Sequence, residues 1–376
     1  MTVRLGIIGM GQQVRKEYVE KHLAARVRNA NDVRIEWVSG YLAADEKNVE
    51  ELRSKVGSAC RFAPDKAWQK WIVEVPVDAV LVSLPNALHA APLECALQRG
   101  IHAAVDKPTT VSPHDCARLV QLARANNLVF MTMSQRRYED VYRTVRTLFE
   151  NGSVGEPRLI EALMAHEYFG GRGSKRWEYS KQAAGGGALI ASGYHLIDTI
   201  FWLLSKLPQP VTPVSVSARW VLDDNPSIEL GDRVETAASV NIGLSNGGTF
   251  HITASYDAAP GALDENIKIF GSGGTIRIMR DRFRRTDQKA AALSYQDQHG
   301  AVAQYDTSEW VGLRWKPLEQ FLAAVKSVKE GRPSPALESS AADSLPTIAV
   351  IDLAYRSAQQ DGKPLRFALE DYYETA

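Results

Sequence analysis

The chain of 376 residues is 45% hydrophobic and 23% charged, and its 44 Lys and Arg residues balance its 44 Asp and Glu residues. This composition is typical of a folded globular protein long enough for two domains, and it excludes a wholly disordered or fibrous chain. Because the formal net charge is zero, no overall field favours nucleic acid or an anionic membrane as a partner.

The N-terminus and the cysteines indicate a compartment. The stretch MTVRLGIIGMG enters an apolar strand directly and lacks the basic region and cleavage site of a secretory signal. No apolar run approaches the roughly 20 residues that cross a bilayer. Cys60, Cys95 and Cys116 are odd in number and share no metal-ligand spacing, which suits a reducing environment. We therefore expect a cytoplasmic protein with no metal site.

The first third of the chain alternates strand-like apolar runs with helical patterns such as Pro113–Asn126. This alternation predicts a parallel sheet built from strand-helix-strand units, whose ligands bind at the carboxyl ends of the strands. The predicted strands are Val3–Ile8, Val33–Ser39, Ala79–Leu84, His102–Val105 and Leu128–Met133.

The first strand leads into a glycine turn and a helix, with the sequence RLGIIGMGQQVRKEYV. Gly9 and Gly11 match the first two glycines of a dinucleotide fingerprint, in which backbone N–H groups approach a pyrophosphate at the helix N-terminus. We predict that these two glycines, Gln12 and Gln13 bind the cofactor, although a plain structural turn is the alternative. The third fingerprint position is Val14, which predicts a slightly displaced helix.

The end of the second strand, at Ser39 and Gly40, is expected to meet the adenosine ribose. A carboxylate there favours NAD and a nearby arginine favours NADP, and this stretch offers neither. The cofactor is therefore NAD or NADP, with NAD slightly favoured.

Polar residues also follow the next two strands of the sheet. Ser83, Pro85, Asn86 and His89 come after one strand, and Asn86 could equally be a helix cap. Asp106-Lys107-Pro108 follows the next strand, where a lysine beside the nicotinamide could hold a substrate hydroxyl, or could be a solvated charge. We predict cofactor contacts from Ser83, Pro85, Asn86, His89, Asp106 and Lys107.

After about residue 135 the pattern changes to alternating strands, with a hairpin predicted at Asn246-Gly247-Gly248 and two late helices, Pro317–Lys329 and Leu345–Gln360. The fold class is therefore α/β, with a Rossmann dinucleotide-binding domain over 1–135 and an α+β domain with an open, mostly antiparallel sheet over 136–376. The predicted strands are Arg158–Ala165, Val214–Val221, Thr236–Leu244, Thr249–Tyr256, Ile267–Phe270 and Thr275–Met279.

The glycine turn, the SLPN run with His89, the DKP triplet and GGGALIASGYHLID at 185–198 occur in an order and spacing that resembles the glucose-fructose oxidoreductase and inositol dehydrogenase family, Gfo/Idh/MocA. The resemblance implies NAD(P)-dependent oxidation or reduction of sugars, polyols or related alcohols. It also implies a homo-dimer or homo-tetramer formed through the exposed face of the second sheet.

Two positions depart from the family pattern. Asp106 replaces the usual glutamate of the Glu-Lys-Pro triplet, and Ala191 stands where many relatives have an aspartate four residues before the histidine. Positions 191 and 195 share one face of a helix, so an aspartate there could hydrogen-bond the imidazole or the substrate.

A catalytic role for His195 follows from its ordinary pKa near 6.5, which suits a base that accepts a hydroxyl proton during hydride transfer. Lys107 would bind the same oxygen. Asp198 is the nearest acid in sequence that could orient the imidazole, although the resemblance implies that its family counterpart is more often structural. Taken alone, His195 could be a packed core residue. Gly185–Gly187 and Gly193 are expected to allow close approach of a ligand or of another element.

Substrate contacts are expected from the polar segment GGRGSKRWEYSKQ at 170–182, from residues after the predicted strand Leu128–Met133 and from the histidine motif, although such residues could equally form a solvated surface. The predicted substrate-binding residues are Arg137, Arg176, Trp177 and Tyr194. Two alternatives to a sugar or polyol dehydrogenase stay open. One is a non-catalytic regulatory protein that keeps the dinucleotide fold, suggested by Ala191, and the other is an enzyme of the same fold that acts on a non-sugar alcohol.

Overall fold

The computed structural model describes residues 1–30, 32–40, 46–57, 59–63, 66–167, 177–225, 228–259, 261–281, 292–305 and 313–373. The chain divides into two compact units, which we treat separately. Unit 1 comprises Met1–Gln135 and Gly312–Ser344, and unit 2 comprises Arg136–Val311 and Leu345–Thr375. The expected second domain is therefore interrupted, since residues 312–344 return to the first unit.

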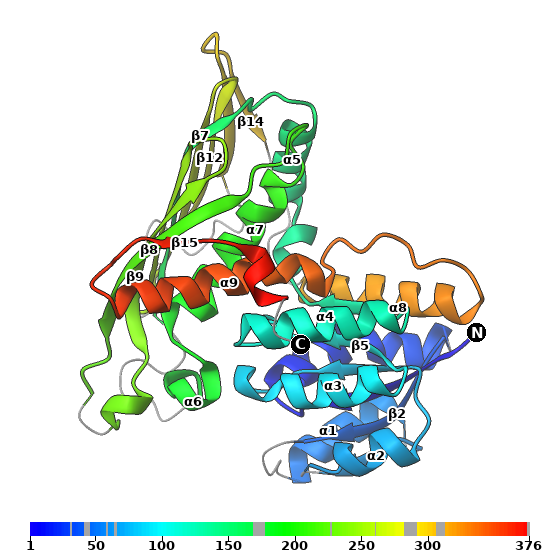
Figure 1. The fold of residues 1–376 in the computed structure, drawn as a ribbon. Helices are drawn as coiled ribbons and strands as arrows, with labels where there is room; N and C mark the ends of the chain where they lie inside the picture. The colour runs from blue at the N-terminus through cyan, green and yellow to red at the C-terminus, as the bar shows by residue number, and fades with distance from the viewer. Residues whose placement is uncertain are drawn as a thin grey trace. The chain divides into compact units, whose positions relative to one another are not determined.

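Unit 1 contains the predicted doubly wound sheet (Figure 1). Its six strands run in the order β3-β2-β1-β4-β5-β6, and all the neighbouring pairs are parallel. Four strands are fully or almost fully buried, which explains their continuous apolar runs. The strands are β1 (Val3–Ile8), β2 (Val33–Ser39), β3 (Arg61–Ala63), β4 (Ala79–Val82), β5 (His102–Val105) and β6 (Phe130–Thr132).

Helices cover both faces of this sheet. Contacts join η1, α1, η8 and α8 as one group and α2, α3 and α4 as another. Helix α4 shows how local sequence sets a helix start, because the hydroxyl of Ser112 accepts the N–H of Asp115 at 3.2 Å and Pro113 occupies the first turn. The helices are η1 (Gln13–Leu23), η2 (Arg26–Ala30), α1 (Glu46–Val56), α2 (Trp68–Glu74), η3 (Asn86–Leu88), α3 (Ala90–Gln98), α4 (Pro113–Ala125), η8 (Leu313–Trp315) and α8 (Lys316–Lys329).

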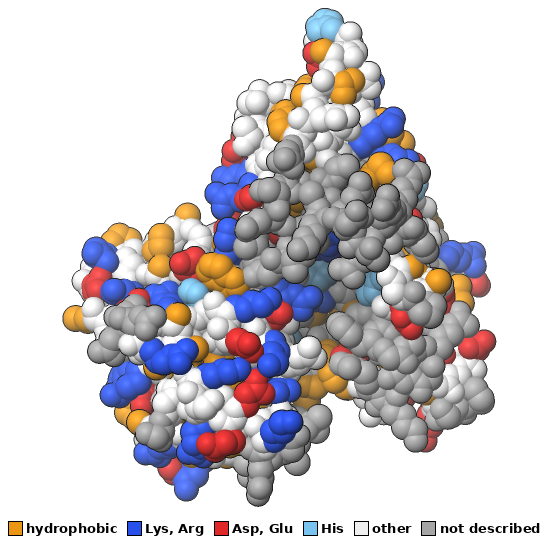
Figure 2. Space-filling model, turned by 180° about the vertical axis from the view of Figure 1, so that it is seen from behind, with side chains coloured by type: hydrophobic (Ala, Val, Ile, Leu, Met, Phe, Trp, Pro, Cys, Tyr) orange, Lys and Arg blue, Asp and Glu red, His pale blue; other side chains and the backbone are white. Residues whose placement is uncertain are grey.

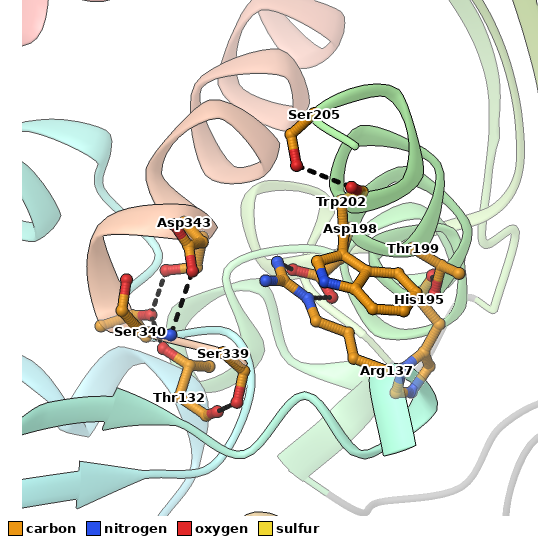
Figure 3. Close-up of polar contacts among 12 residues, drawn as sticks. Thr132, Arg137, His195, Asp198, Thr199, Trp202, Ser205, Ser339, Ser340 and Asp343 are labelled. Carbon is orange, nitrogen blue, oxygen red and sulfur yellow. Dashed lines mark hydrogen bonds and ion pairs between the residues drawn. The ribbon is translucent and has the colours of Figure 1, made fainter. Parts of the chain in front are cut away.

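The return segment of unit 1 is held to the sheet by packing and by backbone pairing. Helix α8 contacts β1 and β5, and Ser339 and Ser340 line the free edge of β6. The N–H of Thr132 donates to the carbonyl of Ser339 at 3.1 Å, and the Ser339 hydroxyl donates back to the carbonyl of Thr132 at 2.8 Å (Figure 3). Figure 2 shows acidic and basic side chains intermixed over the visible face of this unit, as the balanced composition implies.

Unit 2 contains a nine-stranded sheet in the order β14-β13-β12-β11-β7-β10-β9-β8-β15. The prediction of a mostly antiparallel sheet is confirmed, and the exception is the parallel pair β7 and β10. The hairpin at Asn246-Gly247-Gly248 joins β9 and β10 as predicted. The strands are β7 (Pro157–His166), β8 (Pro213–Leu222), β9 (Glu235–Leu244), β10 (Thr249–Ser255), β11 (Leu263–Gly271), β12 (Gly274–Asp281), β13 (Ala292–Asp297), β14 (Val302–Tyr305) and β15 (Leu365–Arg366).

The helices of unit 2 include α7, which is buried at every position except His195. The segment Lys181–Leu204 is long and apolar enough to cross a membrane, but 83% of its most apolar window is buried inside the protein, as in a core helix. The helices are η4 (Gln135–Tyr138, beginning in unit 1), α5 (Asp140–Glu150), η5 (Trp177–Tyr179), α6 (Lys181–Ala184), η6 (Leu189–Gly193), α7 (Tyr194–Leu204), η7 (Leu230–Asp232), α9 (Ala341–Ala358, also beginning in unit 1) and η9 (Leu369–Tyr372).

Candidate functional site

The glycine turn after β1 has the geometry of a phosphate-binding turn. Gly9 has a φ of +122°, and a Cβ on it would lie 1.9 Å from the carbonyl oxygen of Ser83, so a side chain is excluded. Gly11 is exposed, and a Cβ there would meet no atom within 4 Å. The backbone therefore folds tightly against β4 on one side and leaves space at the N-terminus of η1 on the other, which fits the approach of a pyrophosphate.

Helix η1 is wound as a π-helix, in which N–H groups bond carbonyls five residues back. The N–H of Ala24 donates to the carbonyl of Val19, and Val14 is 0% exposed under the turn. Gln12 is exposed at the N-cap and Gln13 is half-buried, so both predicted cofactor residues lie at the open end of the helix.

Asp106 of the DKP triplet is hydrogen-bonded to two other residues of unit 1. Its carboxylate accepts hydrogen bonds from the phenol of Tyr18, on η1, and from the hydroxyl of Ser83, at the end of β4. Burial raises the pKa of Asp106, and the two hydroxyl donors act in the opposite direction. Lys107 follows half-buried, and its peptide bond to Pro108 is cis. The network links the glycine turn to the predicted catalytic lysine, and Tyr18 is a member that the sequence did not indicate.

His89 contacts the backbone of this triplet at Pro108. The ring is 0% exposed, and its Nδ1 and Nε2 lie 2.8 and 2.9 Å from the carbonyl oxygens of Pro108 and Leu84. These contacts fix the loop after β5, so we withdraw the predicted cofactor contact for the His89 ring. Asn86 is 8% exposed in η3, and Pro85 caps that helix.

Ser39 and Gly40 follow β2 as predicted. The Ser39 hydroxyl accepts the N–H of Trp68 at 3.0 Å, and the residue is 0% exposed. The Ser39 side chain is therefore bound within the protein, and neither Ser39 nor Gly40 offers a charged group that selects between NAD and NADP.

The second glycine segment, in unit 2, surrounds a buried carboxylate. Glu235 on β9 accepts the N–H groups of Gly187 and Leu189 at 2.8 and 2.9 Å and the phenol of Tyr355 at 2.9 Å. Burial raises the pKa of Glu235, and these donors oppose that effect. A Cβ on Gly186 would lie 1.9 Å from the Tyr355 hydroxyl, and one on Gly187 would lie 2.0 Å from the Glu235 carbonyl oxygen. Packing within unit 2 therefore explains these two glycines without a ligand.

Gly193 and Ala191 pack against the same sheet. A Cβ on Gly193 would lie 2.8 Å from the Leu189 side chain and 3.5 Å from that of Ala254. Ala191 is half-buried against a cluster made by Tyr179, Ala188, Val234, Ala254 and Tyr256. The absent aspartate is thus replaced by a methyl group that joins an apolar cluster.

His195 is half-buried at the start of α7, and its carbonyl accepts the Thr199 hydroxyl at 2.6 Å (Figure 3). Asp198 does not serve it as predicted. Both Asp198 oxygens accept from Arg137, at 3.0 Å from Nε and 2.6 Å from Nη2, and both side chains are 2% exposed. This buried pair anchors the segment after β6 to α7. We therefore withdraw the catalytic role for Asp198 and the substrate role for Arg137.

The remaining predicted substrate residues differ in accessibility. Tyr194 is 0% exposed, and its ring lies nearly perpendicular to the His195 ring, at 84° and 6.2 Å between centroids, so burial argues against contact with a substrate. Trp177 is half-buried in η5 and keeps its candidate role. Arg176 lies outside the described residues.

Comparison with known families identifies both units. Residues 3–134 match the oxidoreductase family with an NAD-binding Rossmann fold, and residues 142–277 match the Gfo/Idh/MocA C-terminal domain. The two matches follow each other and together span most of the chain. The protein belongs to the Gfo/Idh/MocA family of oxidoreductases, and its first domain is an NAD(P)-binding Rossmann domain.

Individual relatives are distant. The chain is 30% identical over 142 residues to 1,5-anhydro-D-fructose reductase of Ensifer adhaerens, covering 38% of this chain and 42% of that protein. It is 28% identical over 283 residues to inositol 2-dehydrogenase 3 of Saccharopolyspora erythraea, covering 74% and 73%. A levoglucosan dehydrogenase solved with NADH and L-sorbose shares the fold, with a TM-score of 0.77 at 17% identity and coverage of 98% and 100%.

Proposed function

We propose that the protein is an NAD(P)-dependent dehydrogenase or reductase acting on a secondary alcohol or ketone of a sugar, polyol or sugar derivative. The observation that supports it most is the glycine turn, which is closed against Ser83 and open at Gly11, on the same sheet edge as Lys107. The named relatives act on sugars or inositol, which supports the substrate class.

Two side chains carry the proposed chemistry. When bound, the nicotinamide cofactor would accept or supply the hydride. In the oxidation direction, a ring nitrogen of His195 takes the proton of the substrate hydroxyl while the Lys107 ammonium donates a hydrogen bond to the same oxygen and stabilises its developing negative charge. Asp106, held by Tyr18 and Ser83, positions the strand end that carries Lys107. NAD is slightly favoured as the cofactor, and Trp177 is a candidate to stack against a sugar ring.

Titration with NADH and NADPH by fluorescence, followed by a panel of sugars, polyols and nucleotide sugars, tests the proposal. Lys107→Met is expected to lower kcat/KM about 10²-fold to 10⁴-fold while leaving cofactor affinity nearly unchanged. Lys70→Met, an exposed lysine on α2, is the matched control and should behave as wild type. Turnover that survives Lys107→Met would contradict the proposed chemistry.

The same assays separate the alternatives. Tight cofactor binding without turnover on any panel member would favour a regulatory protein, for which Ala191 in its apolar cluster is the motivating observation. Turnover of a non-sugar alcohol alone would keep the mechanism and change the substrate class.

We also propose a homo-dimer or homo-tetramer in the cytoplasm. The open face of the nine-stranded sheet offers a broad surface for self-association, and sedimentation of the purified protein tests it. All three cysteines are free thiols, and burial raises the pKa of Cys60 and Cys116 to about 12, which fits stable thiols in a reducing compartment.

A further inference from the structure

Arg314 lies at the glycine turn although it is distant from the turn in sequence. It belongs to η8, outside both segments that match the family, and its Nη1 donates to the Oε1 of Gln13 at 3.0 Å. The neighbouring Trp315 stacks on His22 of η1, with 4.9 Å between ring centroids and 16° between planes. The short helix η8 is therefore docked along η1, and it sets a guanidinium beside the first residue of that helix.

Arg314 has a different kind of partner from the other cations near the glycine turn. Arg15 and Lys16 each pair with Glu51 at 3.0 Å, so each has an acidic partner within the protein. Arg314 is exposed, bonds a neutral amide oxygen and has no ion pair with a carboxylate among the described residues. An exposed guanidinium that bonds a neutral amide next to an open helix N-terminus is suited to an external anion.

Gln13 and Tyr18 of η1 lie between this cation and the DKP triplet. Gln13 accepts from Arg314 and acts on the pKa of the Tyr18 phenol, which burial raises, and Tyr18 donates to Asp106. The positive charge of Arg314 also acts on Asp106, where it opposes the larger effect of burial on the pKa. Gln13 is thus bonded to a cation and Tyr18 to a carboxylate, both on η1.

We propose that Arg314 binds the pyrophosphate of the dinucleotide, which makes the return segment of unit 1 part of the cofactor site. The inference rests on the cofactor binding of the proposed function. In a Rossmann fold the pyrophosphate lies at the N-terminus of the helix after the first strand, where Gln13 lies, whereas a 2′-phosphate lies at the end of the second strand, after Ser39. The position of Arg314 therefore selects the pyrophosphate, and it adds a bidentate donor to the backbone N–H groups.

The test compares Arg314→Gln with wild type in titrations of NADH, NADPH and ADP-ribose. Loss of a hydrogen-bonded charge at a phosphate should weaken all three by a similar factor, about 10-fold to 100-fold, and should reduce the salt dependence of binding. Arg314→Lys should lie between the two. Arg99→Gln, at an exposed arginine after α3, is the matched control and should bind as wild type.

Each other outcome rejects the proposal in a distinct way. A loss confined to NADPH would assign Arg314 to the 2′-phosphate instead. Unchanged affinity for all three ligands, with thermal unfolding as in wild type, would leave Arg314 outside the site. Wild-type protein that binds neither dinucleotide would overturn the proposed function itself. Weak binding is distinguished from no binding by repeating the wild-type NADH titration at low salt, where binding to the phosphates should strengthen.

Discussion

A glycine-rich segment leads into a helix in each unit, and the two segments serve different partners. Gly9 and Gly11 leave the N-terminus of η1 open, with nothing within 4 Å of a Cβ on Gly11. Gly186 and Gly187 bring the backbone against Tyr355 and Glu235, whose carboxylate accepts the N–H groups of Gly187 and Leu189 at the start of η6. Both helix N-termini favour an anion. In unit 2 the Glu235 carboxylate takes this place, whereas in unit 1 the helix N-terminus is open to the proposed dinucleotide.

The largest expected effect is a loss of stability when the packed glycine segment of unit 2 is disrupted. Gly187→Ala would place a Cβ 2.0 Å from the carbonyl oxygen of Glu235, a backbone atom that cannot move without displacing β9. Overpacking of this kind costs about 3 kcal/mol or more, so we expect poor folding or a large drop in the urea midpoint. Gly231→Ala, where a Cβ meets nothing, is the control. Equal midpoints for Gly187→Ala and wild type would remove the packing explanation.

In unit 1, His22 on η1 is expected to make the free energy of unfolding depend on pH. Burial, and then the charge of Arg26, lowers the pKa of His22 to about 4 from 6.5. As the pH falls from about 6.5 to about 4, the unfolded chain takes up the proton before the folded protein does. The free energy of unfolding therefore falls, by up to about 3 kcal/mol over that range.

His22→Phe should keep the stacking on Trp315 and remove this part of the acid sensitivity. Urea unfolding at pH 7 and pH 4.5 measures the difference for each protein. His299→Phe, at an exposed histidine, should leave the difference as in wild type. An unchanged difference in His22→Phe would show that His22 is protonated equally in the folded and unfolded states.

The fold was predictable where the pattern was long and buried. The predictions for β1, β2 and β5 are confirmed at both ends because each is a mostly buried strand within an apolar run. The prediction missed β3, β13, β14 and β15. β3 has three residues and β15 has two, and both lie at sheet edges, where partial exposure removes the apolar pattern. Helix α9 starts earlier than predicted, because Asp343 accepts the N–H of Ser340 and caps it.

The candidate site was predictable only where its residues are neighbours in sequence. The glycine turn and the DKP triplet follow strands and could be read directly. Tyr18 and Asp106 are 88 positions apart, Glu235 and Gly187 are 48 apart, and Arg137 and Asp198 are 61 apart. No local pattern pairs such residues, so the sequence predicted His195 as a base and wrongly supplied Asp198 as its partner.

A moderate effect is expected from removing the internal anion of unit 2. Glu235→Gln keeps the shape but turns an amide N–H₂ toward Gly187 or Leu189, so one buried N–H loses its acceptor. The cost is about 1 to 3 kcal/mol in the free energy of unfolding, measured in urea at pH 7. Tyr355→Phe removes the third donor and should cost less, because the carboxylate keeps both backbone partners. A more stable Glu235→Gln protein would mean that burial of the charge outweighs its hydrogen bonds.

The smallest effect on folding, and the sharpest on function, is expected at the open turn. Gly11→Ala adds a Cβ that meets no atom within 4 Å, so the free energy of unfolding should change by less than about 0.5 kcal/mol. The same methyl group would stand where the pyrophosphate approaches the backbone, and we expect NADH to bind about tenfold more weakly. Fluorescence titration measures this, with Gly231→Ala as the control in unit 2. If Gly11→Ala bound NADH as tightly as wild type, the space at the turn would not be the pyrophosphate site. The proposed functional difference between the two glycine segments would then be rejected.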